Sequence, residues 1–184
     1  MRSWLMAALA LGALVGAAPG AEGEDPAAAL AASKERWVKA REQCQGSYTY
    51  WVRTASWVGA RTETTIVVER NKVIERRYKA TSGRAPAPAP GPAPRAEGDV
   101  EWVETGDEVG KHKEGAPPRT LDQLYDEARQ VVERPRGKHE RLVQRFDRAG
   151  LLLACFTVDT RIMDDAPIKG VNIAEIKLAE RKAE

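Results

Sequence analysis

The hydrophobic pattern of the first half of the chain predicts one helix followed by three strands. Residues 25–43 carry apolar side chains at helical spacing, with Asp25 as a capping residue and Pro26 at the first helical position. The period then changes to two at 48–53, where aromatic and polar residues alternate as in a strand. The same reasoning predicts two further strands, joined at Asn71, over residues 61–69 and 72–80.

The second half repeats this order. Thr120 and Gln123 have the spacing of a capping box, and an apolar stripe at helical spacing follows them until Pro135 ends the helix. The next run, 140–147, alternates apolar and polar residues, whereas 151–158 is almost continuously apolar, which indicates a central strand. The pattern predicts a last strand over residues 170–178.

A segment of different composition separates the two halves. Residues 85–94 alternate Ala or Gly with Pro, and because proline lacks a backbone donor we expect an extended spacer there. An acidic stretch follows around Trp102. We interpret residues 82–118 as a mobile Pro-rich and acidic insertion with one short strand at 100–104.

This order of elements predicts the α+β class. Each half is a helix followed by a short antiparallel meander, so the chain is expected to build one antiparallel sheet of about six strands in the order α-β-β-β-α-β-β-β. Both helices are expected to pack on one face of that sheet.

The N-terminus has the layout of a secretory signal peptide. Arg2 is followed by an apolar core and then by a run of small residues ending near Ala21. The apolar core is shorter than the roughly 20 residues that span a membrane, although an uncleaved anchor is the alternative. We therefore expect a signal peptide over 1–21, a single domain over 22–184, and export to the periplasm or the medium, with no membrane span after signal removal.

Charge argues against two classes of partner. The chain has 29 basic and 27 acidic residues and a formal net charge of +2, so it lacks the strongly basic balance of proteins that bind nucleic acid or anionic membranes. The partner is then expected to be a protein or a small molecule.

The two cysteines, Cys44 and Cys155, have two readings. An oxidising compartment and the lack of a surrounding His/Cys cluster favour a disulfide bridge. The alternative is a pair of buried free thiols, which the apolar run around Cys155 also allows.

Several short motifs resemble a bacterial exported family, domain of unknown function family 6174. These are Trp37 on a helix, the Tyr48-x-Tyr50 strand opening, the Thr120–Tyr125 helix start, and the Phe146–Asp147 turn with the acidic residues after it. The resemblance covers residues 33–80 and 120–178. It implies an exported location and a fold pattern but no activity, and this chain lacks the Gly-Tyr-Pro turn typical of the family.

Candidate binding residues have both functional and structural readings. Asp159, Asp164 and Asp165 share one loop and offer carboxylates to a hard cation such as calcium, but their spacing is not that of an EF-hand, and solvated turn residues are the favoured reading. No other cofactor is predicted. An aromatic ligand surface at Tyr48, Tyr50 and Trp51 is the alternative to packing in the core, which such rings more often do.

No catalytic motif is present, and neither of the two histidines, His112 and His139, has a nucleophile as a sequence neighbour. We therefore favour a non-catalytic binding or protein-interaction domain of the bacterial envelope or extracellular space. The alternatives are a small exported hydrolase that uses loop carboxylates, and a structural protein attached to the envelope through the Pro-rich spacer.

Overall fold

The computed structural model describes residues 25–55, 60–81, 100–162 and 168–180, and its described part is an α+β domain. Both helices begin and end close to the predicted positions, and Thr120 and Gln123 form the expected capping box. The elements are α1 (Pro26–Gln43), β1 (Tyr48–Ala55), β2 (Arg61–Glu69), β3 (Lys72–Thr81), β4 (Val100–Thr105), η1 (Gly106–Glu108), α2 (Leu121–Glu133), β5 (Glu140–Phe146), β6 (Leu152–Asp159), β7 (Lys169–Asn172) and β8 (Glu175–Leu178).

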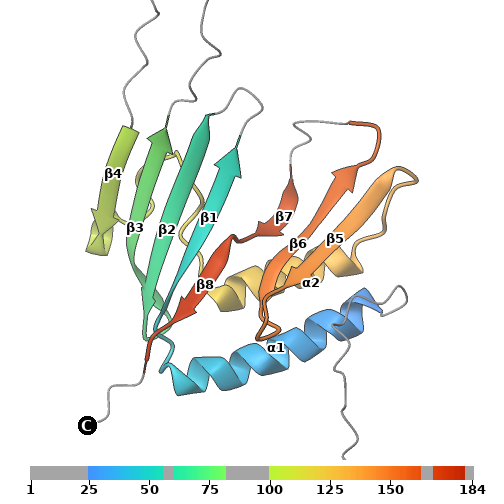
Figure 1. Cartoon of the computed structure of the whole chain (residues 1–184), viewed down its shortest axis with the longest axis horizontal. Coiled ribbons are helices and arrows are strands. Elements are labelled where there is room, and N and C mark those ends of the chain that lie inside the picture. Colours follow the sequence, from blue (N-terminus) through green and yellow to red (C-terminus); the bar gives the residue numbers. More distant parts are fainter. Residues whose placement is uncertain (1–24, 56–59, 82–99, 163–167, 181–184) are drawn as a thin grey trace, which may run out of the picture.

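The strands form two antiparallel sheets, which corrects the prediction of one six-stranded sheet (Figure 1). Sheet A has the order β4-β3-β2-β1-β8, and sheet B has the order β5-β6-β7. Two differences produce this result. The predicted insertion contributes β4 to sheet A, and the last predicted strand breaks at Ile173 and Ala174 into β7 and β8, which pair with different sheets.

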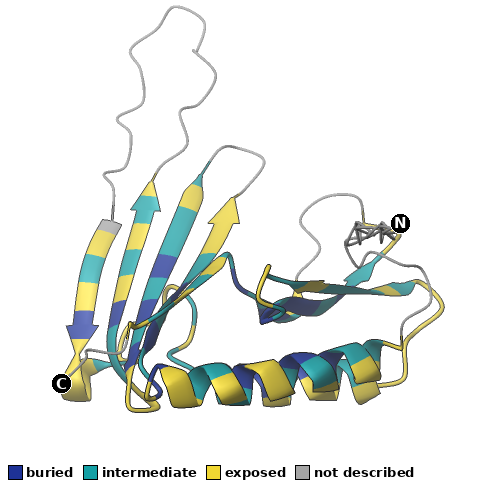
Figure 2. Cartoon of the chain, turned by 60° about the horizontal axis from the view of Figure 1, so that its bottom comes forward, coloured by how far each residue is buried: buried dark blue, intermediate teal, exposed yellow. Residues whose placement is uncertain are grey.

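Both helices run along the same side of the two sheets, and the core lies between them (Figures 1 and 2). Trp37 of α1 is fully buried and meets the Tyr48 ring edge-on, with centroids 5.0 Å apart. Figure 2 shows buried positions where the strands meet the helices, while the far end of β1 is exposed. The buried side chains therefore gather where the strands face the helices.

The residues between β4 and α2, 106–119, cross the inner face of sheet A, and we call them the strap. The Ala116 amide donates to Thr64 Oγ1 at 3.0 Å. Gly115, at φ +80°, lies so close to the sheet that a Cβ there would come within 2.9 Å of both Thr64 Oγ1 and the Tyr78 ring. Residues 100–118 of the predicted insertion are thus integrated into the domain, whereas 82–99, including the Pro-rich run, lie outside the described residues.

Candidate functional site

A groove separates the two sheets beside α2. The chain crosses from sheet B to sheet A at Ile173 and Ala174, and from this point β1 and β7 diverge above α2 (Figure 1). The groove has a volume of about 710 Å³. Its walls and floor are β1, β7, α2 and the end of the strap. The residues that line it include Val52, Thr54, Pro117, Gln130, Ile168 and Asn172.

The floor of the groove is apolar because α2 and β7 turn core-facing side chains toward it. Leu124 and Val131 come from the apolar stripe of α2, Val171 comes from β7, and Ile173 directly follows that strand. Ile168, just before β7, is 47 % exposed and is one of three large hydrophobic residues that the described part of the chain leaves in solvent. A concave site with an apolar floor and a few polar groups around it is typical of a ligand-binding site.

Two strand edges border the groove without a partner strand among the described residues. The Ala174 amide donates to the Trp51 carbonyl, so the Trp51 peptide group faces β8. Peptide groups two residues apart on a strand point to the same side, so those of Arg53 face the same edge of β1, beyond the end of β8. Directly after β7, the Ile173 amide donates to the Leu153 carbonyl of β6. The peptide groups of the preceding residue, Asn172, therefore point away from β6. The groove therefore offers backbone donors and acceptors as well as apolar contacts.

The polar rim of the groove carries an excess of positive charge. Three cationic side chains line it, Arg119, Arg134 and Lys169, against the single carboxylate of Glu127. Arg119 pairs with Glu127, and Arg134 donates to Glu140 and to Thr157. Among the described residues no carboxylate lies within 4.0 Å of the Lys169 ammonium.

The strap wall of the groove is fixed by a buried ion pair. Arg76 and Glu104 are 2 % and 1 % exposed, and Arg76 Nη1 lies 3.1 Å from Glu104 Oε2. The carboxylate also accepts from the Gly110 amide, and from the His112 amide and Nδ1. Burial raises the pKa of Glu104, but these hydrogen bonds and the charge of Arg76 lower it more, to about 2. Glu104 is therefore ionised at neutral pH.

This cluster gives His112 a structural surrounding. Its ring stacks on Trp102 with centroids 4.3 Å apart, and Trp102 in turn stacks on Tyr78. Arg76 donates to the His112 and Glu114 carbonyls, so both sides of the ion pair hold the strap. The residues of this cluster lie on two strands and a loop. The sequence allowed a contact between the basic residues of β3 and the acidic stretch 97–108, but an exposed, charged sheet face was the favoured interpretation.

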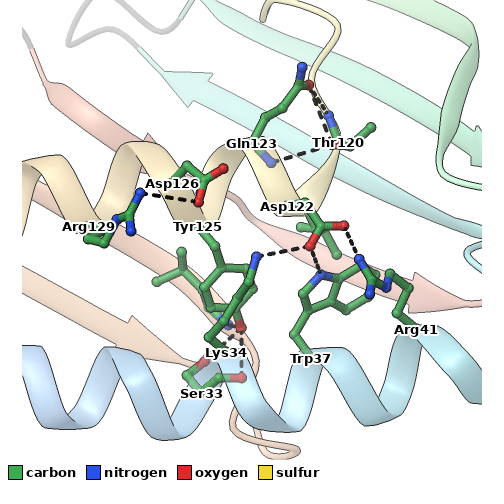
Figure 3. A network of polar contacts seen from close by, with 12 residues as sticks. Ser33, Lys34, Trp37, Arg41, Thr120, Asp122, Gln123, Tyr125, Asp126 and Arg129 are labelled. Carbon is green, nitrogen blue, oxygen red and sulfur yellow. Dashed lines mark hydrogen bonds and ion pairs between the residues drawn. The ribbon is translucent and has the colours of Figure 1, made fainter.

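A second polar cluster lies at the start of α2, where Trp37, Asp122 and Tyr125 come together, and we call it the junction (Figure 3). The Asp122 carboxylate accepts from Lys34 Nζ at 2.9 Å, Trp37 Nε1 at 3.2 Å and Arg41 Nη1 at 3.0 Å. The Tyr125 hydroxyl lies 2.7 Å from Ser33 Oγ and accepts from the Leu152 amide. These contacts therefore tie α1, α2 and the start of β6 together.

The three aromatic residues of the predicted ligand surface lie on two faces of sheet A. Tyr48 and Tyr50 are buried, and burial raises the pKa of both hydroxyls. The Leu121 amide donates to the Tyr48 hydroxyl, and the Tyr50 hydroxyl donates to the Arg119 carbonyl. Trp51, the intervening residue, faces the opposite side. Tyr50 also lines the groove, so one of the three reaches the candidate site.

The predicted disulfide bridge is absent, since Cys44 and Cys155 are both buried free thiols. Cys44 follows the end of α1 and its sulfur contacts the Arg41 carbonyl, whereas Cys155 lies in the central strand of sheet B against the Ala128 carbonyl of α2. The two sulfurs thus pack against different helices. Burial raises the pKa of the Cys155 thiol to about 11.

Of the predicted calcium ligands, Asp159 is the only one within the described residues, and Asp164 and Asp165 lie outside them. Asp159 pairs with Arg161 at 2.6 Å, and hydrogen bonds from that residue hold the pKa of the carboxyl well below its usual range. In the described part of the chain, no three His, Cys, Asp or Glu residues are placed to hold a metal ion.

Comparisons of the chain with models of protein families, with curated proteins and with solved structures give no match. Neither of the described helices is long and apolar enough to cross a membrane.

Proposed function

We propose that the chain is an exported, non-catalytic binding domain and that the groove between its two sheets holds the partner. The observation that carries this proposal is the combination of an apolar floor, an exposed Ile168 and free backbone groups in one concavity of about 710 Å³. That volume falls within the roughly 300–1,000 Å³ of typical ligand sites. The secretory pattern of residues 1–21, which lie outside the described residues, supports an envelope or extracellular location.

The distribution of polar groups supports binding over hydrolysis. Asp159, one of the loop carboxylates considered for hydrolysis, is paired with Arg161, and the buried Glu104 is bound to Arg76 and the strap. The polar side chains around the groove are hydrogen-bond donors and acceptors on a rigid frame, as in a recognition site.

Site-specific photo-crosslinking tests this proposal. Gln130 and Arg129 are consecutive on α2, but Gln130 lines the groove, whereas Arg129 lies on the side toward α1 and pairs with Asp126. A photoreactive residue at 130 is expected to capture a discrete partner in the exporting cell, and the same residue at 129 is expected to capture none. Equal products at both positions, or none at 130, would overturn the proposal.

A further inference from the structure

The strand edges of the groove point to the chemistry of its occupant. We infer that the partner is an acidic polypeptide segment that lies extended in the groove and pairs its backbone with the free edge of β7. This inference rests on the proposed function, and it adds the class of ligand and the mode of recognition.

The edge of β7 is fixed in place before any ligand arrives. Gly170 of β7 lies so close to β6 and α2 that a Cβ would clash with the Cys155 carbonyl and come within 3.0 Å of Val131. The Ile173 amide holds the end of the strand to β6. Because the edge is preorganised, an added strand orders only itself, which lowers the entropic cost of binding.

The dimensions and contacts of the groove fit an extended segment. β7 is four residues long, so it pairs with about four residues of an incoming strand, at roughly 3.3 Å per residue. Alternate side chains of such a strand point to opposite faces, so every second side chain of the segment would meet the apolar floor at Val131 and Ile168.

The charge of the rim selects acidic segments. Lys169 is exposed at the start of β7 and has no described carboxylate within salt-bridge distance, while Arg134 nearby is shared with Glu140. Lys169 and Arg134 both lower the pKa of Glu140, so their positive charges act on the same region. An Asp or Glu in the segment would pair with Lys169. The alternative role for a lysine on an edge strand is to block pairing with other strands.

A displayed library of random twelve-residue peptides, selected on the full chain, tests the inference. Enriched peptides are expected to alternate apolar residues and to contain Asp or Glu. The amides of an enriched peptide fall into two alternating sets, and only one set can bond to β7. N-methylation of that set should weaken binding about tenfold, because it removes the hydrogen bonds to β7. N-methylation of the other set should weaken binding less than about twofold.

Charge reversal provides the second readout. Lys169→Glu should weaken binding of the acidic peptides by about three- to tenfold. Lys177→Glu changes a lysine on β8 that is also exposed but lies outside the groove, and it should leave binding unchanged. Failure to enrich any peptide, equal effects of the two methylation sets, or equal effects of the two lysine variants would each overturn the inference.

The two proposals fail in different ways. A crosslinked adduct at residue 130 that proves not to be a polypeptide would overturn the peptide inference and leave the groove as a binding site. The absence of any adduct at residue 130 would overturn the proposed function itself.

Discussion

The junction and the groove both use residues of α2, but the polar groups of the junction are hydrogen-bonded within the chain, whereas several of those in the groove are open to a partner. At the junction, the Asp122 carboxylate accepts three hydrogen bonds from α1, and Trp37 is fully enclosed (Figure 3). In the groove, the peptide groups of Arg53 and Asn172 face an open space, and Ile168 is half in solvent.

This difference separates stability from function. Saturated, buried contacts lower the free energy of the folded chain, whereas free donors and an exposed apolar side chain do little for folding and remain available to a partner. Changes at the junction should therefore reduce stability, and changes in the groove should reduce binding.

Trp37→Ala is expected to lower the free energy of unfolding by about 3–5 kcal/mol, because it removes a fully buried ring and the hydrogen bond to Asp122. Chemical denaturation measures this change. Trp51→Ala, on the outer face of sheet A, is the control and should cost about 1 kcal/mol. Equal losses in the two variants would show that the junction is not the main source of stability.

Glu104→Gln is expected to cost about 3 kcal/mol, because it leaves the buried Arg76 without a counter-charge. The exposed neighbour Glu101 is the control, and Glu101→Gln should change stability by less than about 0.5 kcal/mol.

The same carboxylate predicts a pH dependence. The pKa of Glu104 is lowered from its ordinary 4.5 to about 2, so its contribution is complete above pH 4.5 and is lost as the pH falls toward 2. Unfolding curves measured between pH 6 and about 2 should show a smaller acid-induced loss of stability in Glu104→Gln than in the natural chain. Parallel acid profiles would contradict this assignment.

Asp122→Asn should cost about 1 kcal/mol, because the side chain is partly exposed and solvent screens its ion pairs with Lys34 and Arg41. Asp126→Asn removes a more exposed carboxylate one turn further along α2 and should have almost no effect. If thermal unfolding finds the two variants equal, the Asp122 network contributes nothing to stability.

Ile168→Ser should change the free energy of unfolding by less than about 0.5 kcal/mol and lower the crosslinking yield at residue 130 roughly three- to tenfold. Ile162→Ser is a matched control, because Ile162 is 49 % exposed but does not line the groove. Similar losses of yield in both variants would argue against a specific role for the groove.

Local signals were sufficient to predict the helices and most strands. Asp25 and Pro26 at one helix start, and Thr120 with Gln123 at the other, act through neighbouring backbone groups, so the sequence alone places these boundaries. The turn at Asn71 has the positive φ that the residue tolerates.

The two-sheet arrangement and the groove depend on contacts that no local pattern records. Residues 170–178 carry one continuous strand pattern, and only tertiary packing decides that the chain changes sheets at Ile173. Arg76 lies in a strongly basic segment typical of an exposed face, yet it is buried because Glu104, 28 residues away, pairs with it. Gln130 and Ile168 meet in the groove from separate segments.

The most direct test of the separation between junction and groove measures stability and partner capture in the same two variants. Asp122→Asn and Ile168→Ser are each combined with the photoreactive residue at 130, and unfolding free energy and crosslinking yield per folded molecule are measured for both. We predict that Asp122→Asn loses stability and keeps its yield, while Ile168→Ser keeps its stability and loses its yield. The reverse pattern, or losses of both quantities in both variants, would contradict the account.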